Sequence, residues 1–155
     1  MKALFDQVSL KASKMVTNAY STSFSLGIRM LNESVREPVY AIYGFVRFAD
    51  EIVDSFEGYD KAALIADFRK QTDEAIDQRI SLNPILNSFQ HAVNHCSIDQ
   101  WLIDAFFDSM EMDLEEQTYD QATFEKYILG SAQVVGLMCL RVFCNGDNAQ
   151  YDSLK

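Results

Sequence analysis

The sequence predicts an all-α fold in a single domain. Apolar residues recur at helical spacing through nearly all of the 155 residues, and 48% of the chain is hydrophobic. Only two prolines and six glycines interrupt this pattern, and these are the residue types that most strongly break regular structure. No internal repeat, low-complexity tract or linker divides the chain. We therefore expect residues 1–155 to form one helical domain with a sizeable core.

The predicted helices share this apolar periodicity, and most begin at a polar residue that can cap the first turn. They are expected at about residues 5–20, 35–56, 60–80, 84–95, 97–116 and 120–145. Ser34 with Glu37, and Ser97 with Gln100, have the spacing of a capping box. The polar run at residues 21–23 breaks the periodicity after the first helix and predicts a loop.

The charge of the chain excludes one large class of partner. Thirteen lysines and arginines stand against 23 aspartates and glutamates, which gives a net charge of -10. Such a protein repels a phosphate backbone, so we expect no nucleic-acid binding. A polyanionic ligand can bind only where cations bridge it to the protein.

Other features also bear on location and metal binding. Charged residues interrupt the apolar stretches, so we expect no transmembrane segment, a cytoplasmic location, and at most peripheral contact with the inner membrane face. Cys96, Cys139 and Cys144 lack CxxC spacing and are interpreted as buried thiols. His91 and His95 are four residues apart, but no third ligand accompanies them, so a zinc site is not expected.

The segment around Asp50 and Asp54 carries the strongest chemical signal. These residues are four apart, so on a helix they share one face, about 6 Å apart along the axis. Like charges at this spacing repel by roughly 0.2–0.5 kcal/mol, whereas hard oxygen ligands at this spacing suit magnesium bridged to substrate phosphates. Arg47, one turn earlier, can supply a fixed positive charge to the same phosphates.

An isolated pair of this kind is more often a solvated acidic face. Here residues 39–48 are apolar around most of the helix, which predicts a helix buried among others. Acidic residues on a buried helix should line a cavity or bind ions. A second acidic cluster, at residues 104–113, is explained equally well as a polar face, because Asp104, Asp108 and Glu111 lie on one side of their helix.

Three stretches of the sequence together resemble the squalene/phytoene synthase family. They are residues 20–27 (YSTSFSLG), residues 40–54 (YAIYGFVRFADEIVD), and residues 110–114 (MEMDL) followed by Tyr127 and residues 135–138 (VGLM). Each stretch is weak alone, but their order and spacing match the amino-terminal half of that family across nearly the whole chain. The MxMDL form and the Phe-Ala-Asp context are more similar to bacterial phytoene synthases than to squalene synthases.

The resemblance implies a helical isoprenoid-synthase fold around a central cavity, here incomplete. It implies a prenyltransferase that condenses two geranylgeranyl diphosphates head to head to phytoene, in carotenoid biosynthesis. One allylic diphosphate would ionise, and the double bond of the second substrate would attack the cation to form a cyclopropyl intermediate. The implied cofactor is magnesium, with manganese as a substitute. Squalene or dehydrosqualene synthesis from farnesyl diphosphate is the alternative reaction.

The resemblance also assigns roles to matched positions. The catalytic positions would be Asp50, Asp54 and Tyr127, with the two aspartates holding the metal as the first aspartate-rich motif and the tyrosine near the reacting carbons. The substrate-binding positions would be Ser21, Ser23, Phe24, Arg47 and Asp113, with Phe24 lining the prenyl pocket.

Two departures from the family pattern affect these expectations. Gln133 stands where the family has a glycine, and a bulkier polar group there would narrow or re-tune the cavity. The family's second aspartate-rich motif lies beyond Lys155, so we expect a truncated product or fragment that is inactive alone and self-associates. A non-catalytic prenyl-binding protein and a plain helical scaffold therefore remain alternatives. Magnesium-dependent binding of a prenyl diphosphate would exclude the scaffold, and turnover would separate enzyme from binder.

Overall fold

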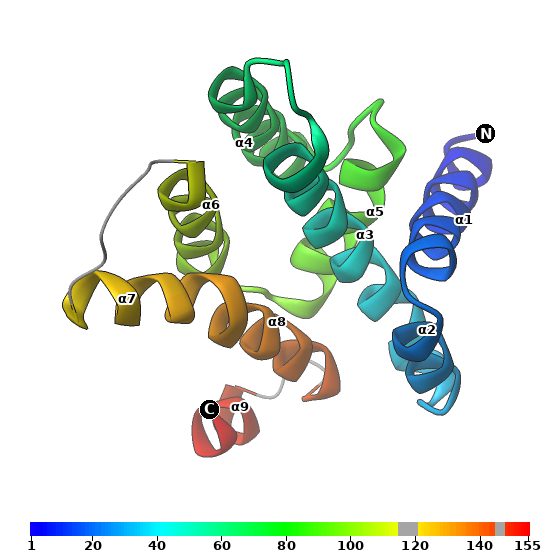
Figure 1. Ribbon diagram of the computed structural model, residues 1–155. Helices are drawn as coiled ribbons and strands as arrows, with labels where there is room; N and C mark the ends of the chain where they lie inside the picture. Colours follow the sequence, from blue (N-terminus) through cyan, green and yellow to red (C-terminus); the bar gives the residue numbers. More distant parts are fainter. Residues whose placement is uncertain (115–120, 145–147) are drawn as a thin grey trace.

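The computed structural model describes residues 1–114, 121–144 and 148–155. Within these ranges the regular structure is helical, without strands, which confirms the predicted fold class. The elements, shown in Figure 1, are α1 (Lys2–Tyr20), α2 (Thr22–Arg29), α3 (Glu33–Ser55), α4 (Lys61–Gln78), α5 (Pro84–Cys96), α6 (Gln100–Leu114), α7 (Gln121–Ile128), η1 (Leu129–Gln133), α8 (Val134–Phe143) and α9 (Asn148–Leu154). The short α9 had no counterpart among the predicted helices.

Helix α3 lies at the centre of the fold (Figure 1) and packs against α1, α4, α5, α6 and α8. Ile42, Phe45 and Ala49 are almost completely excluded from solvent. The ring of Phe45 stacks on Phe89 of α5 with centroids 3.8 Å apart and meets Phe107 of α6 edge-on. Full burial of one such ring contributes on the order of 2–3 kcal/mol. This packing confirms that the helix with the acidic pair is buried among others.

Several capping residues differ from the predicted ones. Ser21 alone separates α1 from α2, and its hydroxyl accepts a hydrogen bond from a backbone N–H of the first turn of α2. The loop predicted at residues 21–23 is therefore wrong. Asn32, not Ser34, caps α3. Ser97 takes a left-handed conformation (φ 57°) at the end of α5, so the predicted capping box is not formed there.

Other predicted helix starts are confirmed. Asp60 caps α4 by accepting a hydrogen bond from the backbone N–H of Ala63. Asn83 caps α5, with Pro84 in the first turn, where its missing N–H has no helical partner to lose. The predicted boundaries at residues 116, 120 and 145 lie outside the described residues.

The helix from α7 to α8 contains a feature that periodicity did not predict. Over η1 its backbone has π-helical hydrogen bonding, a rare geometry that often occurs at functional sites. A Cβ atom at Gly130 would lie only 2.4 Å from the carbonyl oxygen of Ala105 and 2.6 Å from Cβ of Ser109. Glycine is thus what lets η1 approach α6 so closely. Gln133, which replaces the expected glycine, is exposed at the end of η1.

The same helix is also the most apolar segment. By length and composition residues Phe124–Phe143, with a mean hydropathy of 1.3, could cross a membrane, and no second stretch in the described ranges meets that test. One such helix is weak evidence, because core helices of water-soluble proteins also meet it. The predicted absence of a transmembrane segment and the cytoplasmic location therefore remain predictions.

Candidate functional site

Three acidic side chains predicted from the sequence influence one another through their charges, where the C-terminal part of α3 packs against α6. Asp50 is partly buried, and Asp54, one turn later, is exposed. Asp113 belongs to the last turn of α6, and its charge acts on Asp50 together with that of Asp54. Residues about sixty positions apart in the sequence thus share one acidic site.

The electrostatics of this site are unfavourable without a cation. Burial raises the pKa of the Asp50 carboxyl from 3.8 to about 6; Arg47 opposes this rise, and the charges of Asp54 and Asp113 add to it. Burial, followed by the charge of Asp54, also raises the pKa of Asp113. Within the part of the chain that the structure describes, neither Asp54 nor Asp113 has an ion-pair partner. These carboxylates are available to a ligand that brings positive charge.

Arg47 is held next to these acids. Its Nη2 donates a hydrogen bond to Oε2 of Glu51 at 2.7 Å, and its guanidinium lies over the ring of Tyr20, 4.7 Å from the centroid. Burial is the largest single influence on the pKa of Arg47 and would lower it, but the hydrogen bond to Glu51 and the negative charges of Glu51, Asp50 and Asp54 together raise it. The buried Nε has no acceptor among the described residues. One donor of the guanidinium is therefore unused.

The contribution of Glu51 and Tyr20 was not predicted from the sequence. Glu51 accepts a hydrogen bond from Arg47, which is the main reason why its pKa is lowered, and the hydroxyl groups of Ser55 and Tyr20 lower the pKa further. The spacing of Arg47 and Glu51, four residues apart, was a signal that could have identified this ion pair. In the absence of ligand, Glu51 therefore neutralises the cation that was predicted to contact a diphosphate.

The start of α2 lies next to Arg47. The guanidinium of Arg47 overlies the ring of Tyr20, and Tyr20 directly precedes Ser21, the cap of α2. The Ser21 hydroxyl is occupied as the helix cap, and Ser23 is exposed in the first turn. Phe24 stacks on Tyr43 of α3, with ring centroids 4.6 Å apart. Because Tyr43 lies one turn before Arg47, this aromatic pair adjoins the polar site. The roles of Ser21, Ser23 and Phe24 in substrate binding remain predictions.

Tyr127 is placed less directly. It is half-buried on α7, whose main packing partners are η1 and α6. Its predicted position near the reacting carbons therefore remains a prediction. The π-helical turn η1 begins at Leu129, two residues after Tyr127.

The second acidic cluster is a structural ion network. Nη1 of Arg69, on α4, binds Oδ1 of Asp108 at 3.0 Å and Oε1 of Glu111 at 3.2 Å, and Nη2 lies 3.8 Å from Asp104. These pairs tie α4 to α6. They leave Asp113, further along α6, for the site at α3.

The remaining candidate metal ligands are the histidines, the cysteines and the carboxylate pair of α3. In the described ranges no three His, Cys, Asp or Glu side chains gather closely enough to hold an ion. His91 and His95 stack as parallel rings. All three cysteines are free thiols; Cys96 and Cys144 are buried as predicted, whereas Cys139 is only partly buried. A pair of carboxylates still fits magnesium, which keeps several waters and takes its other ligands from substrate phosphates. Asp50 and Asp54 are the pair that offers this.

Known proteins share this architecture and sequence pattern. Residues 17–154 match the family described as squalene/phytoene synthase. The presqualene diphosphate synthase of Zymomonas mobilis is 31% identical over 149 residues, which cover 90% of this chain and 48% of that protein. The presqualene diphosphate synthase of Sinorhizobium fredii is 32% identical over 130 residues, covering 82% of this chain and 46% of that protein.

A solved structure shares the fold. A crystal structure of a dehydrosqualene synthase in complex with ligand superposes with a TM-score of 0.77 at 20% identity, over 88% of this chain and 48% of that one. The chain thus spans slightly less than half the length of the curated relatives it matches. The family match extends over most of its residues. The chain belongs to the squalene/phytoene synthase family.

Proposed function

We propose that this chain forms the part of a head-to-head prenyltransferase site that binds the departing diphosphate of farnesyl diphosphate, in the synthesis of presqualene diphosphate. The observation that carries the proposal is the meeting of Asp50, Asp54 and Asp113 beside Arg47, with two of the carboxylates unpaired. The named relatives support a squalene-type reaction. Farnesyl diphosphate, the alternative substrate, is thus better supported than geranylgeranyl diphosphate, and a squalene-type product is better supported than phytoene.

The carboxylates cannot bind a diphosphate directly, because like charges repel. Asp50 and Asp54, with Asp113 nearby, present hard oxygen ligands on one side of the site. Magnesium bound there would neutralise the charge that develops on the leaving diphosphate. The raised pKa of Asp50 means that its ionised form is unfavourable without a ligand, and a bound cation would stabilise that form.

Arg47 supplies the charge that the protein itself contributes. Its planar guanidinium suits two phosphate oxygens at once, and its Nε has no other acceptor among the described residues. Nη2 of the same guanidinium donates to Glu51, so a diphosphate that accepts a hydrogen bond from Nη2 competes with Glu51. Phe24 and Tyr43 form the adjoining apolar wall, which would keep water from an allylic cation.

Calorimetric titration with inorganic diphosphate tests this site in the 155-residue chain. We expect binding in the presence of magnesium and none after chelation with EDTA. Asp54→Asn should weaken binding by about tenfold or more, since it removes one anionic ligand. Asp77→Asn is the matched control, because Asp77 is an exposed acid on α4 and its loss changes net charge equally. Equal losses in both variants, or binding that persists without metal, would contradict the proposal.

The same titration with a non-hydrolysable thio analogue of farnesyl diphosphate tests the substrate class. We expect tighter binding than for inorganic diphosphate, because the prenyl chain buries apolar surface against the wall beside Arg47. Equal affinities would leave the diphosphate site but reject a prenyl substrate. Release of diphosphate from farnesyl diphosphate itself would distinguish a catalyst from a prenyl-binding protein.

A further inference from the structure

A second polar groove lies apart from the acidic site, between the start of α1, the end of α4 and the face of α5. Its volume is about 290 Å³, and all the residues that line it are polar: Lys2, Arg79, Gln90, His91, Asn94 and His95. None of these residues belongs to α3 or α6, which carry the acidic site. The groove is therefore a separate candidate for ligand binding.

The charge of the groove is opposite to that of the protein as a whole, which is -10. Lys2 is paired with Asp6 at 2.8 Å, whereas Arg79 has no hydrogen bond or ion pair with any described residue. Arg79 also takes a left-handed backbone conformation (φ 60°) at the end of α4. That position usually holds glycine, and a larger residue there costs about 1 kcal/mol. Arg79 thus stands, without a partner among the described residues, at a position where glycine would be less strained.

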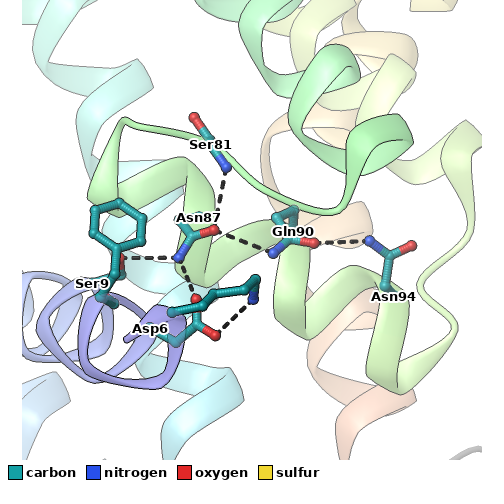
Figure 2. A network of polar contacts seen from close by, with 8 residues as sticks. Asp6, Ser9, Ser81, Asn87, Gln90 and Asn94 are labelled. Carbon is teal, nitrogen blue, oxygen red and sulfur yellow. Dashed lines mark hydrogen bonds and ion pairs between the residues drawn. The ribbon is translucent and has the colours of Figure 1, made fainter.

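A buried network under the groove fixes the helices that line it (Figure 2). The amide of Asn87 donates to Asp6 of α1 at 2.9 Å and accepts from Gln90 at 3.4 Å. Asn94 donates to Gln90 at 3.0 Å and to the carbonyl oxygen of Ile76, on α4, at 3.2 Å. Three helices are therefore joined through buried polar groups. Such a network fixes the helices that carry Lys2 and the two histidines before any ligand arrives.

The two histidines form the centre of the groove. Their rings on α5 are parallel within 5°, with centroids 5.7 Å apart, and both side chains are exposed. Each imidazole carries an N–H group that can donate a hydrogen bond to an anion bound beside the pair. The charged groups that face them are Lys2 and Asp6 of α1, Arg79 of α4 and, through the neighbouring cavity of about 370 Å³, Glu37 of α3.

We propose that this groove binds a small phosphate anion, either inorganic phosphate or diphosphate. An arginine fork and a lysine ammonium are the side chains that recognise phosphate oxygens. The carboxylates of Asp6 and Glu37 line the neighbouring cavity, so the anion lies on the side of Lys2 and Arg79. A lining without apolar side chains offers no place for the chains of a lipid.

Proton NMR of the imidazoles provides a direct assay, because the chain contains only two histidines and both line this groove. Sodium phosphate and sodium diphosphate are titrated separately at constant ionic strength, in EDTA, which keeps diphosphate away from the metal-dependent acidic site. We expect saturable shifts of both imidazole signals with phosphate and with diphosphate.

Two charge variants separate a built site from general attraction. Arg79→Gln should weaken binding about tenfold, which is the effect of losing one charge-assisted hydrogen bond. Lys11→Gln removes the same charge from an exposed position on α1 outside the groove, and it should leave the affinity within about twofold. Equal effects of the two variants would overturn the proposal. So would shifts reproduced by sodium chloride, or shifts seen only with phosphatidic acid vesicles.

Discussion

Replacing Asp50 by asparagine should stabilise the metal-free protein while abolishing cation binding. Partial burial and the charges of Asp54 and Asp113 raise the pKa of Asp50 from 3.8 to about 6. One pKa unit corresponds to about 1.4 kcal/mol, so ionised Asp50 costs the folded state up to about 3 kcal/mol. Asparagine has nearly the same shape and no charge. Because the side chain keeps some contact with water, we expect a gain of about 1–3 kcal/mol at pH 7.5.

The gain depends on pH in a defined direction. The folded protein binds the Asp50 proton more tightly than the unfolded chain, since folding raises the pKa of this carboxyl. This contribution to stability is fully present below about pH 4 and is lost as the pH rises through about 6. The difference between Asp50→Asn and wild type should therefore be near zero at pH 4 and reach its full size above pH 7.

Urea unfolding in EDTA at pH 4.5, 6.0 and 7.5 measures this difference. In thermal unfolding at pH 7.5 the same gain would raise Tm by roughly 2–4 °C for each kcal/mol in a chain of this size. Asp54→Asn is the control, because Asp54 is exposed and its replacement should change stability by less than about 0.5 kcal/mol. An Asp50→Asn protein that is less stable than wild type at pH 7.5, or indistinguishable from Asp54→Asn, would refute the reasoning.

Three further predictions concern packing, the guanidinium and the exposed surface. Gly130→Ala should lower the free energy of unfolding by about 1–3 kcal/mol in urea titrations, since its Cβ would overlap α6; Gly136→Ala, where a Cβ meets nothing within 4 Å, should be neutral or stabilising. Arg47→Ala should weaken magnesium-dependent diphosphate binding more than Arg47→Lys, and equal losses in calorimetry would indicate a structural role. The chain alone should self-associate in light scattering, because apolar side chains such as Phe124 and Phe143 are exposed; a monodisperse monomer would contradict this.

The sequence predicted the position of α3 and its acidic pair because both depend on local pattern. A helix that is apolar around most of its circumference has to be enclosed by others, and Asp50 and Asp54 share a face wherever their helix lies. The position of Asp113 near this pair could not be predicted from local pattern. Its proximity depends on how α6 crosses α3, which no spacing within either helix determines, so only the resemblance indicated that it belongs to the site.

Helix boundaries were less predictable because neighbouring residues offer similar caps. Asn32 and Ser34 both have side chains that can accept a hydrogen bond from a free N–H, and the preference between such caps is within about 1 kcal/mol. The packing of α2 and α3 therefore decides which one is used. The π-helical turn in η1 follows the same logic, because the close approach at Gly130 is a tertiary contact.

The two acidic clusters show why an acidic pattern does not by itself identify a metal site. Asp104, Asp108 and Glu111 share a helix face as clearly as Asp50 and Asp54 do, yet Arg69 of α4 reaches all three within 4 Å. Each of these acids thus has a cationic partner inside the protein, although the three share a single guanidinium.

At the end of α3 the compensation is incomplete. The nearby guanidinium of Arg47 is engaged by Glu51, and burial, with the charges of Asp54 and Asp113 added, holds the pKa of Asp50 near 6. A partly buried carboxylate of this kind is kept where a ligand stabilises its charge, because selection for stability alone would replace it by a neutral residue. The lack of a free counter-charge, more than the number of acids, distinguishes the proposed binding site from the ion network.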